Sequence, residues 1–201
     1  MTTPTTLVQL ADVKKHLNID TNDDDVELRA FIDAATEKVQ EITGPVLTRT
    51  VTEYRDGGTV SLLLRERPVQ SITSVTELWA NSSYTLTQTE FGAGASQFDF
   101  TFDVSQSEIT RRINNLPEVF PDGVGNVKVV YVAGYATIPS RIRLATLALI
   151  QHWWSASQLN RNGGRPSLGG SDFSPAMGGG YAVPNFVREM LPQVDKVSWL
   201  A

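Results

Sequence analysis

The sequence contains no cysteine and only two histidines, so several kinds of chemistry have no residues to carry them. Without a thiolate there is no cysteine nucleophile, no disulfide and no cysteine-based zinc site. His16 and His152 belong to no HExxH motif, and the chain has neither a GxSxG motif nor a glycine-rich loop that ends in Gly-Lys-Ser/Thr. We therefore expect no enzyme activity, no catalytic residue, no metal and no cofactor.

Long apolar runs and a strong positive charge are missing as well. Arg141, Arg143 and Gln151 interrupt the most apolar stretch, so no run reaches the length of a membrane span. The amino terminus lacks a basic region followed by an apolar run, so we expect no secretory signal. The formal net charge is -5, which argues against a basic nucleic-acid-binding surface. These features predict a soluble intracellular protein that does not associate with membranes.

The charge is unevenly distributed along the chain. Residues 6–43 hold four basic and nine acidic side chains, whereas residues 139–201 hold six basic and three acidic ones. An acidic beginning and a basic end suit head-to-tail contact between identical subunits. Two solvated faces would give the same distribution, so the sequence leaves both interpretations open.

One polar stretch imitates a calcium site. Asp20, Asn22 and Asp24 are spaced like the first ligands of an EF-hand loop. The sixth position is Asp25 instead of glycine, and the twelfth is Phe31 instead of glutamate. We interpret the stretch as a polar turn that caps the next helix.

Apolar spacing predicts helices near both ends of the chain. Thr6 and Gln9 fit a capping box before a short helix. A second helix follows Asp24 and ends at Gly44-Pro45, with one apolar stripe formed by Leu28, Phe31, Ile32, Ala35, Val39 and Ile42. A third helix starts at Pro139 and runs to about residue 159, and a short fourth follows Pro184.

The middle of the chain predicts strands. Segments rich in valine and threonine are separated by Gly, Pro, Asn and Asp turns, at 47–58, 60–64, 69–79, 84–87, 98–103 and 127–132. We expect about five or six strands. Phe98, Phe100 and Phe102 alternate with polar residues, so we expect Asp99 and Asp103 to face solvent.

The predicted fold class is α+β. A helical core, made of an N-terminal helix hairpin and the long helix near 139–159, would carry an antiparallel β-rich insertion and an extended C-terminal arm. The predicted divisions are 1–45 for the hairpin, 46–133 for the insertion, 134–160 for the core helix, and 161–201 for the linker and arm. We expect the glycine-rich 161–181 to be flexible until a partner binds.

The third helix is apolar nearly all round. Ile142, Ala145, Leu149 and Trp153 share one side, and most of the rest is covered by Leu144, Leu147, Ala148 and Ile150. Such a helix is either the centre of a single domain or part of a subunit interface. The aromatic and leucine residues that follow the glycine-rich linker favour an interface.

Several stretches resemble the head-tail connector family of tailed bacteriophages, also called adaptor or head-completion proteins. They are LADVKKHLNID, DDDVELRAFIDAATEKVQEITG, RPVQSITSVTEL and VKVVYVAGYATIPSRIRLATLALIQHWW. The resemblance covers about 7–79 and 126–195. It implies a structural virion protein without catalytic residues, in a closed dodecameric ring below the portal at the capsid vertex. The ring would extend the DNA channel, let genomic DNA pass without specific binding, and offer a platform to the stopper or tail-completion protein.

The resemblance also implies where the contacts lie. In the carboxy-terminal segment, the expected portal interface comprises Tyr181, Phe186, Val187, Arg188, Leu191, Trp199 and Leu200. The expected interface between copies in the ring comprises Arg141, Leu144, Leu147 and Trp154. The protein would occupy the virion neck, and the host cytoplasm during assembly.

Two other functions stay open at this point. A small β-rich carbohydrate-binding module or enzyme could use Trp79, Tyr84 and the 98–102 face as an aromatic platform. A neighbouring virion part, such as a stopper or tail terminator, is the third; the helices at both ends argue against it, since those proteins are usually β-barrels.

Overall fold

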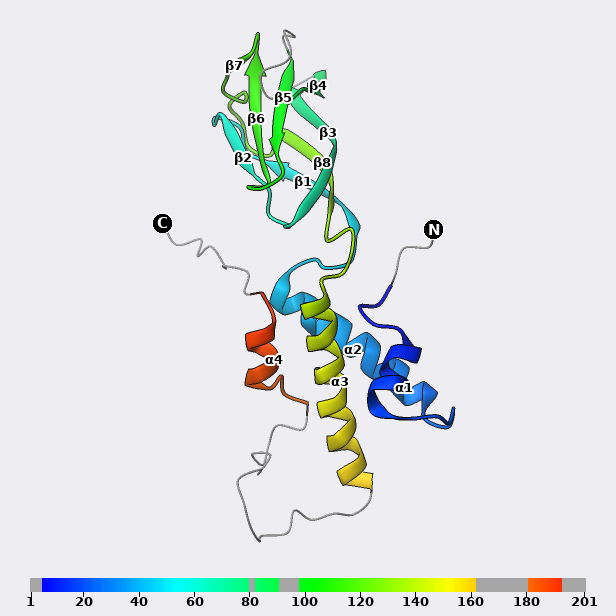
Figure 1. Ribbon diagram of the computed structural model, residues 1–201. Coiled ribbons are helices and arrows are strands. Elements are labelled where there is room, and N and C mark those ends of the chain that lie inside the picture. Colours follow the sequence, from blue (N-terminus) through cyan, green and yellow to red (C-terminus); the bar gives the residue numbers. More distant parts are fainter. Residues whose placement is uncertain (1–4, 80–81, 91–97, 162–180, 193–201) are drawn as a thin grey trace. The chain divides into compact units, whose positions relative to one another are not determined.

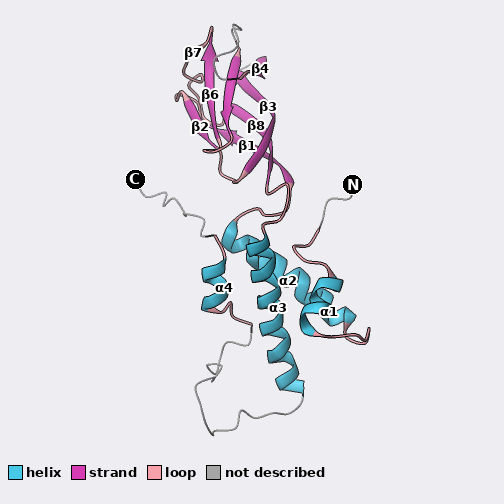
Figure 2. Ribbon diagram, viewed as in Figure 1, coloured by secondary structure: helices cyan, strands magenta, loops and turns pink. Residues whose placement is uncertain are grey.

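The computed structural model describes residues 5–79, 82–90, 98–161 and 181–192. The chain divides into two compact units. Pro45–Thr137 forms one, and Met1–Gly44 together with Ile138–Ala201 forms the other. All described strands belong to the first, the β unit, and all described helices to the second, the helical unit (Figure 2). The fold is therefore α+β, as the sequence predicted.

The described residues of the helical unit form four helices: α1 (Leu10–Leu17), α2 (Asp25–Thr43), α3 (Ser140–Arg161) and α4 (Asn185–Met190) (Figure 1). α3 contacts each of the other three. This explains its all-round apolar sequence, because three neighbours share its surface. Its buried side chains are those of Ile142, Ala145, Thr146, Leu149, Ile150, Trp153 and Ser157. Within the described residues, no helix combines the length and the apolar character needed to cross a membrane.

α1 begins three residues later than a capping box at Thr6 predicts. Gln9 is the N-cap, and its backbone N–H donates to Asp12 Oδ2 at 3.4 Å. Leu7 and Val8 are buried, and the Leu7 N–H donates to Thr36 Oγ1 of α2 at 3.2 Å. Because this hydrogen bond holds Leu7 against α2 and both side chains are buried, the helix starts only after residue 8.

The short helix predicted after Pro184 is present as α4, and it packs on α3. Val183, Val187 and Leu191 are no more than 6% exposed. The guanidinium of Arg141 donates through Nη2 to the Glu189 carbonyl at 2.5 Å, which adds a polar contact between the two helices. Residues 183–191 of the predicted arm therefore belong to the helical unit, while most of the glycine-rich linker lies outside the described residues.

The described part of the β unit contains eight strands, two more than the upper prediction. They are β1 (Arg49–Arg55), β2 (Ser61–Leu63), β3 (Val69–Trp79), β4 (Ser82–Gln88), β5 (Asp99–Asp103), β6 (Glu108–Ile113), β7 (Leu116–Pro117) and β8 (Val127–Ala133). The strand order is β1-β8-β3-β4-β5-β6-β2, with β7 paired to β6. All pairs are antiparallel except β4 with β5. β6 and β7 are the strands that the sequence pattern missed.

Side chains from β2 to β6 and from β8 form most of the core of the β unit. Its largest fully buried side chains are Tyr131, Phe120, Leu64 and Ile109. Four consecutive residues of β5, from Asp99 to Phe102, are buried, so this strand is covered on both faces. The expectation that Asp99 faces solvent is therefore wrong: it lies opposite Arg112 in the β5–β6 ladder, inside the unit.

The chain enters and leaves the β unit at adjacent points. The Tyr135 N–H donates to the Val46 carbonyl at 2.9 Å, and Thr48 Oγ1 donates to the Tyr135 carbonyl at 3.1 Å. Gly134 has φ +106°, and a Cβ there would lie 2.5 Å from the Leu47 carbonyl oxygen. Only glycine allows so close an approach of the two segments.

Candidate functional site

The described residues offer no evident site for metal or acid–base chemistry. Among them, no three His, Asp or Glu side chains gather where they could hold a metal ion. His16 Nε2 lies 3.0 Å from Gln151 Oε1, which ties α1 to α3, and His152 is half-buried on α3.

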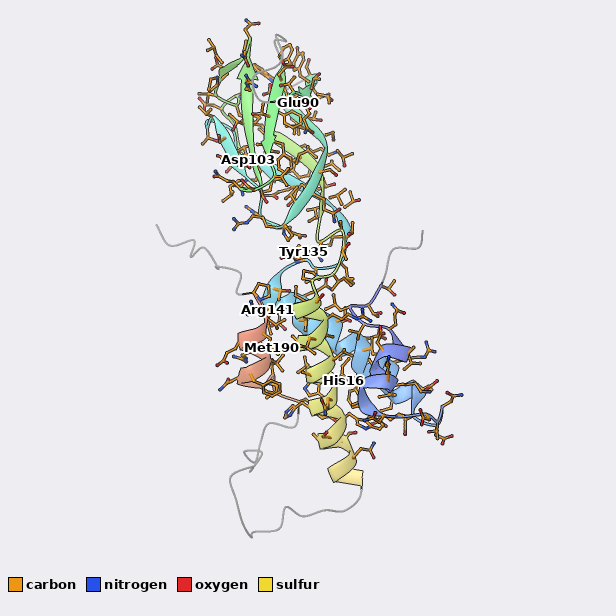
Figure 3. All side chains as sticks on the ribbon, in the orientation of Figure 1. His16, Glu90, Asp103, Tyr135, Arg141 and Met190 are labelled. Atoms are coloured by element: carbon orange, nitrogen blue, oxygen red, sulfur yellow. The ribbon has the colours of Figure 1, made fainter. Side chains whose placement is uncertain are left out.

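The structure places the four predicted subunit-interface residues in two regions of α3. Arg141 and Leu144 lie near its start, where both are exposed, Leu144 by 51%; Figure 3 labels Arg141. Leu147 is half-buried. Trp154 lies about 20 Å from Arg141 along the helix axis, at 1.5 Å per residue. Its ring meets Phe31 of α2 edge-on, with centroids 6.3 Å apart.

The predicted portal residues also divide. Tyr181, Phe186 and Arg188 are exposed, the first two by 60% and 52%. Val187 and Leu191 are buried in the helical unit, where they hold α4 on α3. They could reach a portal directly only if α4 left α3. Trp199 and Leu200 lie outside the described residues.

A groove along α2 was not anticipated from the sequence. Its walls are the rings of Phe31, Trp153 and Tyr181, whose centroids lie 6.3–6.5 Å apart, and its other lining residues include Ala30, Ala34 and Glu37. We call it the α2 groove. The signal that could have revealed it is Ala30 and Ala34, one turn apart on the polar side of a helix whose apolar stripe lies elsewhere.

The rim of the α2 groove is acidic. Lys38 Nζ forms an ion pair with Glu41 at 2.7 Å, which neutralises the one basic side chain that lines the groove. Glu37, exposed one turn before Glu41, has no hydrogen bond or ion pair with any residue that the structure describes. The groove thus combines apolar and aromatic walls with an unpaired carboxylate, a suitable arrangement for an apolar partner that also carries a positive charge.

The adjacent arginines of β6 are used inside the β unit. Arg111 Nε donates to Glu77 Oε1 at 2.5 Å and Nη2 to Oε2 at 3.4 Å, with both residues no more than 5% exposed. Arg112 donates to the carbonyls of Glu90 at 3.4 Å and Asn115 at 3.1 Å. Arg111 therefore faces the carboxylate of Glu77 inside the unit.

A second buried polar cluster surrounds Tyr131. Its hydroxyl donates to Glu53 Oε2 at 2.8 Å and accepts from the Glu66 N–H at 3.2 Å. Burial raises the pKa of Tyr131 well above its ordinary value, and the hydrogen bond to Glu53 raises it further. The phenol therefore remains a donor, and the cluster stabilises the β unit without offering a reactive group.

The aromatic platform considered for a sugar is only partly present. Tyr84 and Phe98 stack on each other with centroids 5.3 Å apart and an interplanar angle of 9°, and Trp79 meets Tyr84 edge-on at 6.2 Å. Each stacked ring covers one face of the other, and Phe100 and Phe102 are buried in the core. The 98–102 segment therefore does not supply an exposed row of rings.

Comparison with known proteins identifies one family and a set of similar folds. The sequence profile described as head completion protein matches residues 6–193, which include both units. No curated protein matches the chain. Among solved structures, this chain is similar to one from the neck of an empty gene transfer agent (GTA) particle, computed with C6 symmetry. The two are 16% identical and have a TM-score of 0.52. The match covers 96% of this chain and 94% of the neck chain. A chain from the neck of a native GTA particle, computed with C12 symmetry, is 15% identical with the same TM-score and coverage. At these identities the similarity establishes the fold.

Proposed function

Because this chain belongs to the head completion protein family, we propose that it is a structural protein of the virion neck, where it joins a phage-type head to its tail. The family match across both units carries this proposal. The exposed apolar side chains around α2, α3 and α4 support it, because a joining protein presents such surfaces to its neighbours. On this proposal the protein has no catalytic role.

The proposed assembly is a closed ring of twelve copies beneath the portal. Similarity of fold to chains from GTA particle necks computed with C6 and C12 symmetry supports a ring of this order. The ring extends the channel through which genomic DNA passes, and a net charge of -5 suits passage without tight binding. Its other side serves as the platform for the stopper or tail-completion protein. The subunit is made in the host cytoplasm and ends at the capsid vertex.

The proposed portal contact is made by the exposed part of the carboxy-terminal region. Tyr181, Phe186 and Arg188 offer two aromatic rings and a cation at the surface of the helical unit. Trp199 and Leu200, in the segment that follows α4, supply further apolar anchors. Val187 and Leu191 position α4 for this contact instead of meeting the portal themselves.

The experiment uses DNA-filled, portal-bearing capsids that lack this protein. Purified protein is added, and binding is measured by co-sedimentation and by imaging of the vertex. We expect a ring of twelve subunits at the portal vertex and recovery of tail attachment. Absence of binding, or binding spread over the capsid, would exclude the proposed function.

Truncation tests the portal contact. Deletion of residues 193–201 leaves α4 in place, whereas a deletion from residue 182 would uncover α3. We expect the protein that lacks only residues 193–201 to fold normally and to lose attachment to portal-bearing capsids. A matched control is Val124→Ala, since Val124 is 92% exposed in the β unit. Normal attachment of the truncated protein would contradict the part proposed for Trp199 and Leu200 in this contact.

A further inference from the structure

A closed ring built from head-to-tail contacts needs two different surfaces on every subunit, one for each neighbour. The helical unit presents two surfaces of complementary character, the α2 groove and the start of α3. The inference that follows rests on the proposed function, because it concerns how copies meet within that ring.

The first surface is the α2 groove together with the exposed face of α2 next to it. Val26, Ala30 and Ala34 are exposed at four-residue intervals, with Val26 at 83%. Small side chains at this spacing let the backbone of another helix approach closely. The ring of Phe31 borders this row and offers an apolar wall.

Charge distinguishes this surface from a purely apolar one. Asp33 and Glu37 are exposed one turn apart, and neither pairs with another described residue. Lys38 is paired with Glu41 and leaves the surface negative. An occupant therefore needs a small or branched apolar side chain and a cation about one turn away.

The second surface supplies those two features on one helix. Leu144 is 51% exposed on α3, and Arg141 is exposed one turn before it. Arg141 uses a single donor, Nη2, to reach the Glu189 carbonyl, so the remaining guanidinium N–H groups are available to a carboxylate. Arg143, its neighbour, is already paired with Asp12 at 2.6 Å and is not needed.

We propose that the first two turns of α3 in one copy dock on the α2 groove of the next copy. Leu144 packs on Ala30 and Ala34 beside the Phe31 ring, and Arg141 forms an ion pair with Glu37. Trp154 then belongs to the receiving surface, through its contact with Phe31. Three of the four residues predicted as one interface, Arg141, Leu144 and Trp154, thus belong to the two complementary halves of a heterologous contact, which explains their separation along α3.

Charge reversal tests this arrangement at two exposed positions. Arg141→Glu also loses the donor to the Glu189 carbonyl, so hydrogen exchange of the α4 amides is compared with the wild type before ring formation is measured. Glu37→Arg and Arg141→Glu should each weaken ring formation on portal-bearing capsids at least about tenfold. An equimolar mixture of the two variants should restore it in a ring where they alternate. There the two natural side chains pair at one contact, and the two substituted side chains form the same ion pair, reversed, at the next. Asp20→Arg, an exposed acid outside the groove, is the matched control and should leave ring formation unchanged.

Cross-linking gives a second readout that does not depend on charge. The natural chain has no cysteine, so Ala34→Cys and Leu144→Cys each introduce a single thiol. Under oxidation, a mixture of these variants on capsids should yield mixed disulfide-linked dimers. Ala11→Cys mixed with Leu144→Cys, with the first thiol exposed on α1, should not.

The outcomes separate the two proposals. If the wild type adds no ring to portal-bearing capsids, the proposed function fails, and the docking arrangement with it. If the wild type adds rings while the mixture of reversed variants stays inactive and the thiols at positions 34 and 144 do not cross-link, only the docking arrangement is overturned.

Discussion

The Glu77–Arg111 pair shows how single residues hold the β unit together. Both side chains lie in the interior, where each charge is acceptable only because the other is present. Removal of one partner leaves an unpaired charge in a region that water does not reach, at a cost of about 3–5 kcal/mol. Replacement of both side chains by apolar residues removes both buried charges, so neither is left without a partner.

The first prediction follows from this asymmetry. Glu77→Leu or Arg111→Met alone should lower the free energy of unfolding by about 3 kcal/mol or more, and the double variant should recover most of the loss. Urea unfolding measures all three. Arg49→Met breaks the more exposed Arg49–Glu66 pair and should cost less than about 1 kcal/mol. Single-variant losses as small as this control would show that the buried pair is not essential.

The second prediction concerns alkaline pH and Tyr131. Its pKa is raised above the ordinary value of 10.0, so above that pH the unfolded chain loses a proton that the folded chain keeps. Stability contributed by this group is complete below pH 10 and falls as the pH rises further, by up to about 1.4 kcal/mol per pH unit. Unfolding free energies measured from pH 8 to 11 should fall less steeply for Tyr131→Phe than for the wild type. Parallel curves would contradict this account.

At the scale of elements, the sequence was most informative where one pattern dominates. β3 has the predicted bounds Val69–Trp79, because its alternation and its flanking turns agree. α2 ends at Gly44-Pro45 as predicted, and α3 extends to Arg161, slightly beyond the predicted end. The sequence does not predict β6, because two adjacent arginines, Arg111 and Arg112, are typical of an exposed segment. Its partners, Glu77 above all, lie far away in sequence, and no local pattern can reveal such a pair.

The candidate site was only partly visible from the sequence for a similar reason. Arg141, Leu144 and Trp154 are among the predicted contacts between copies, and the sequence pattern alone cannot tell that Trp154 lies beside Phe31 of another helix. The α2 groove depends on residues from α2, α3 and position 181, brought together only by folding. The assignment of these residues to a ring interface remains a prediction.

The third prediction concerns the attachment of α4. Leu191 is 2% exposed where α4 packs on α3, so Leu191→Ala should weaken this packing by about 2–5 kcal/mol. Hydrogen exchange of the α4 amides should become faster, while α1–α3 keep their protection. Phe186→Ala, at a position that is 52% exposed on α4, is the control and should change the exchange little. Unchanged exchange in Leu191→Ala would mean that α4 is held in another way.

At the scale of the whole molecule, the β unit has a hydrophobic core of its own. All members of the β unit's hydrophobic cluster lie between Leu62 and Ala133. The segments at which the chain enters and leaves this unit are hydrogen-bonded to each other through Val46 and Tyr135. Because the two ends of the insertion are joined to each other, we expect the β unit to fold without the helical unit.

The fourth prediction follows from this closure. A fragment of residues 45–137 should fold alone, with a β-type circular dichroism spectrum and a cooperative thermal transition. Residues 1–44 alone should not, because their apolar stripe depends on α3. A fragment of the β unit that melts without cooperativity would show that its core needs the helical unit.

The helical unit draws on both ends of the polypeptide, and this has a consequence on the ribosome. α1 and α2 emerge early, yet α3 follows only after the entire β unit, a delay of roughly 5–20 s at 5–20 residues per second. Until then a nascent chain lacks the helix that closes its first half. Prematurely terminated products are thereby kept out of any particle, since they never acquire the fold that a neighbour could recognise.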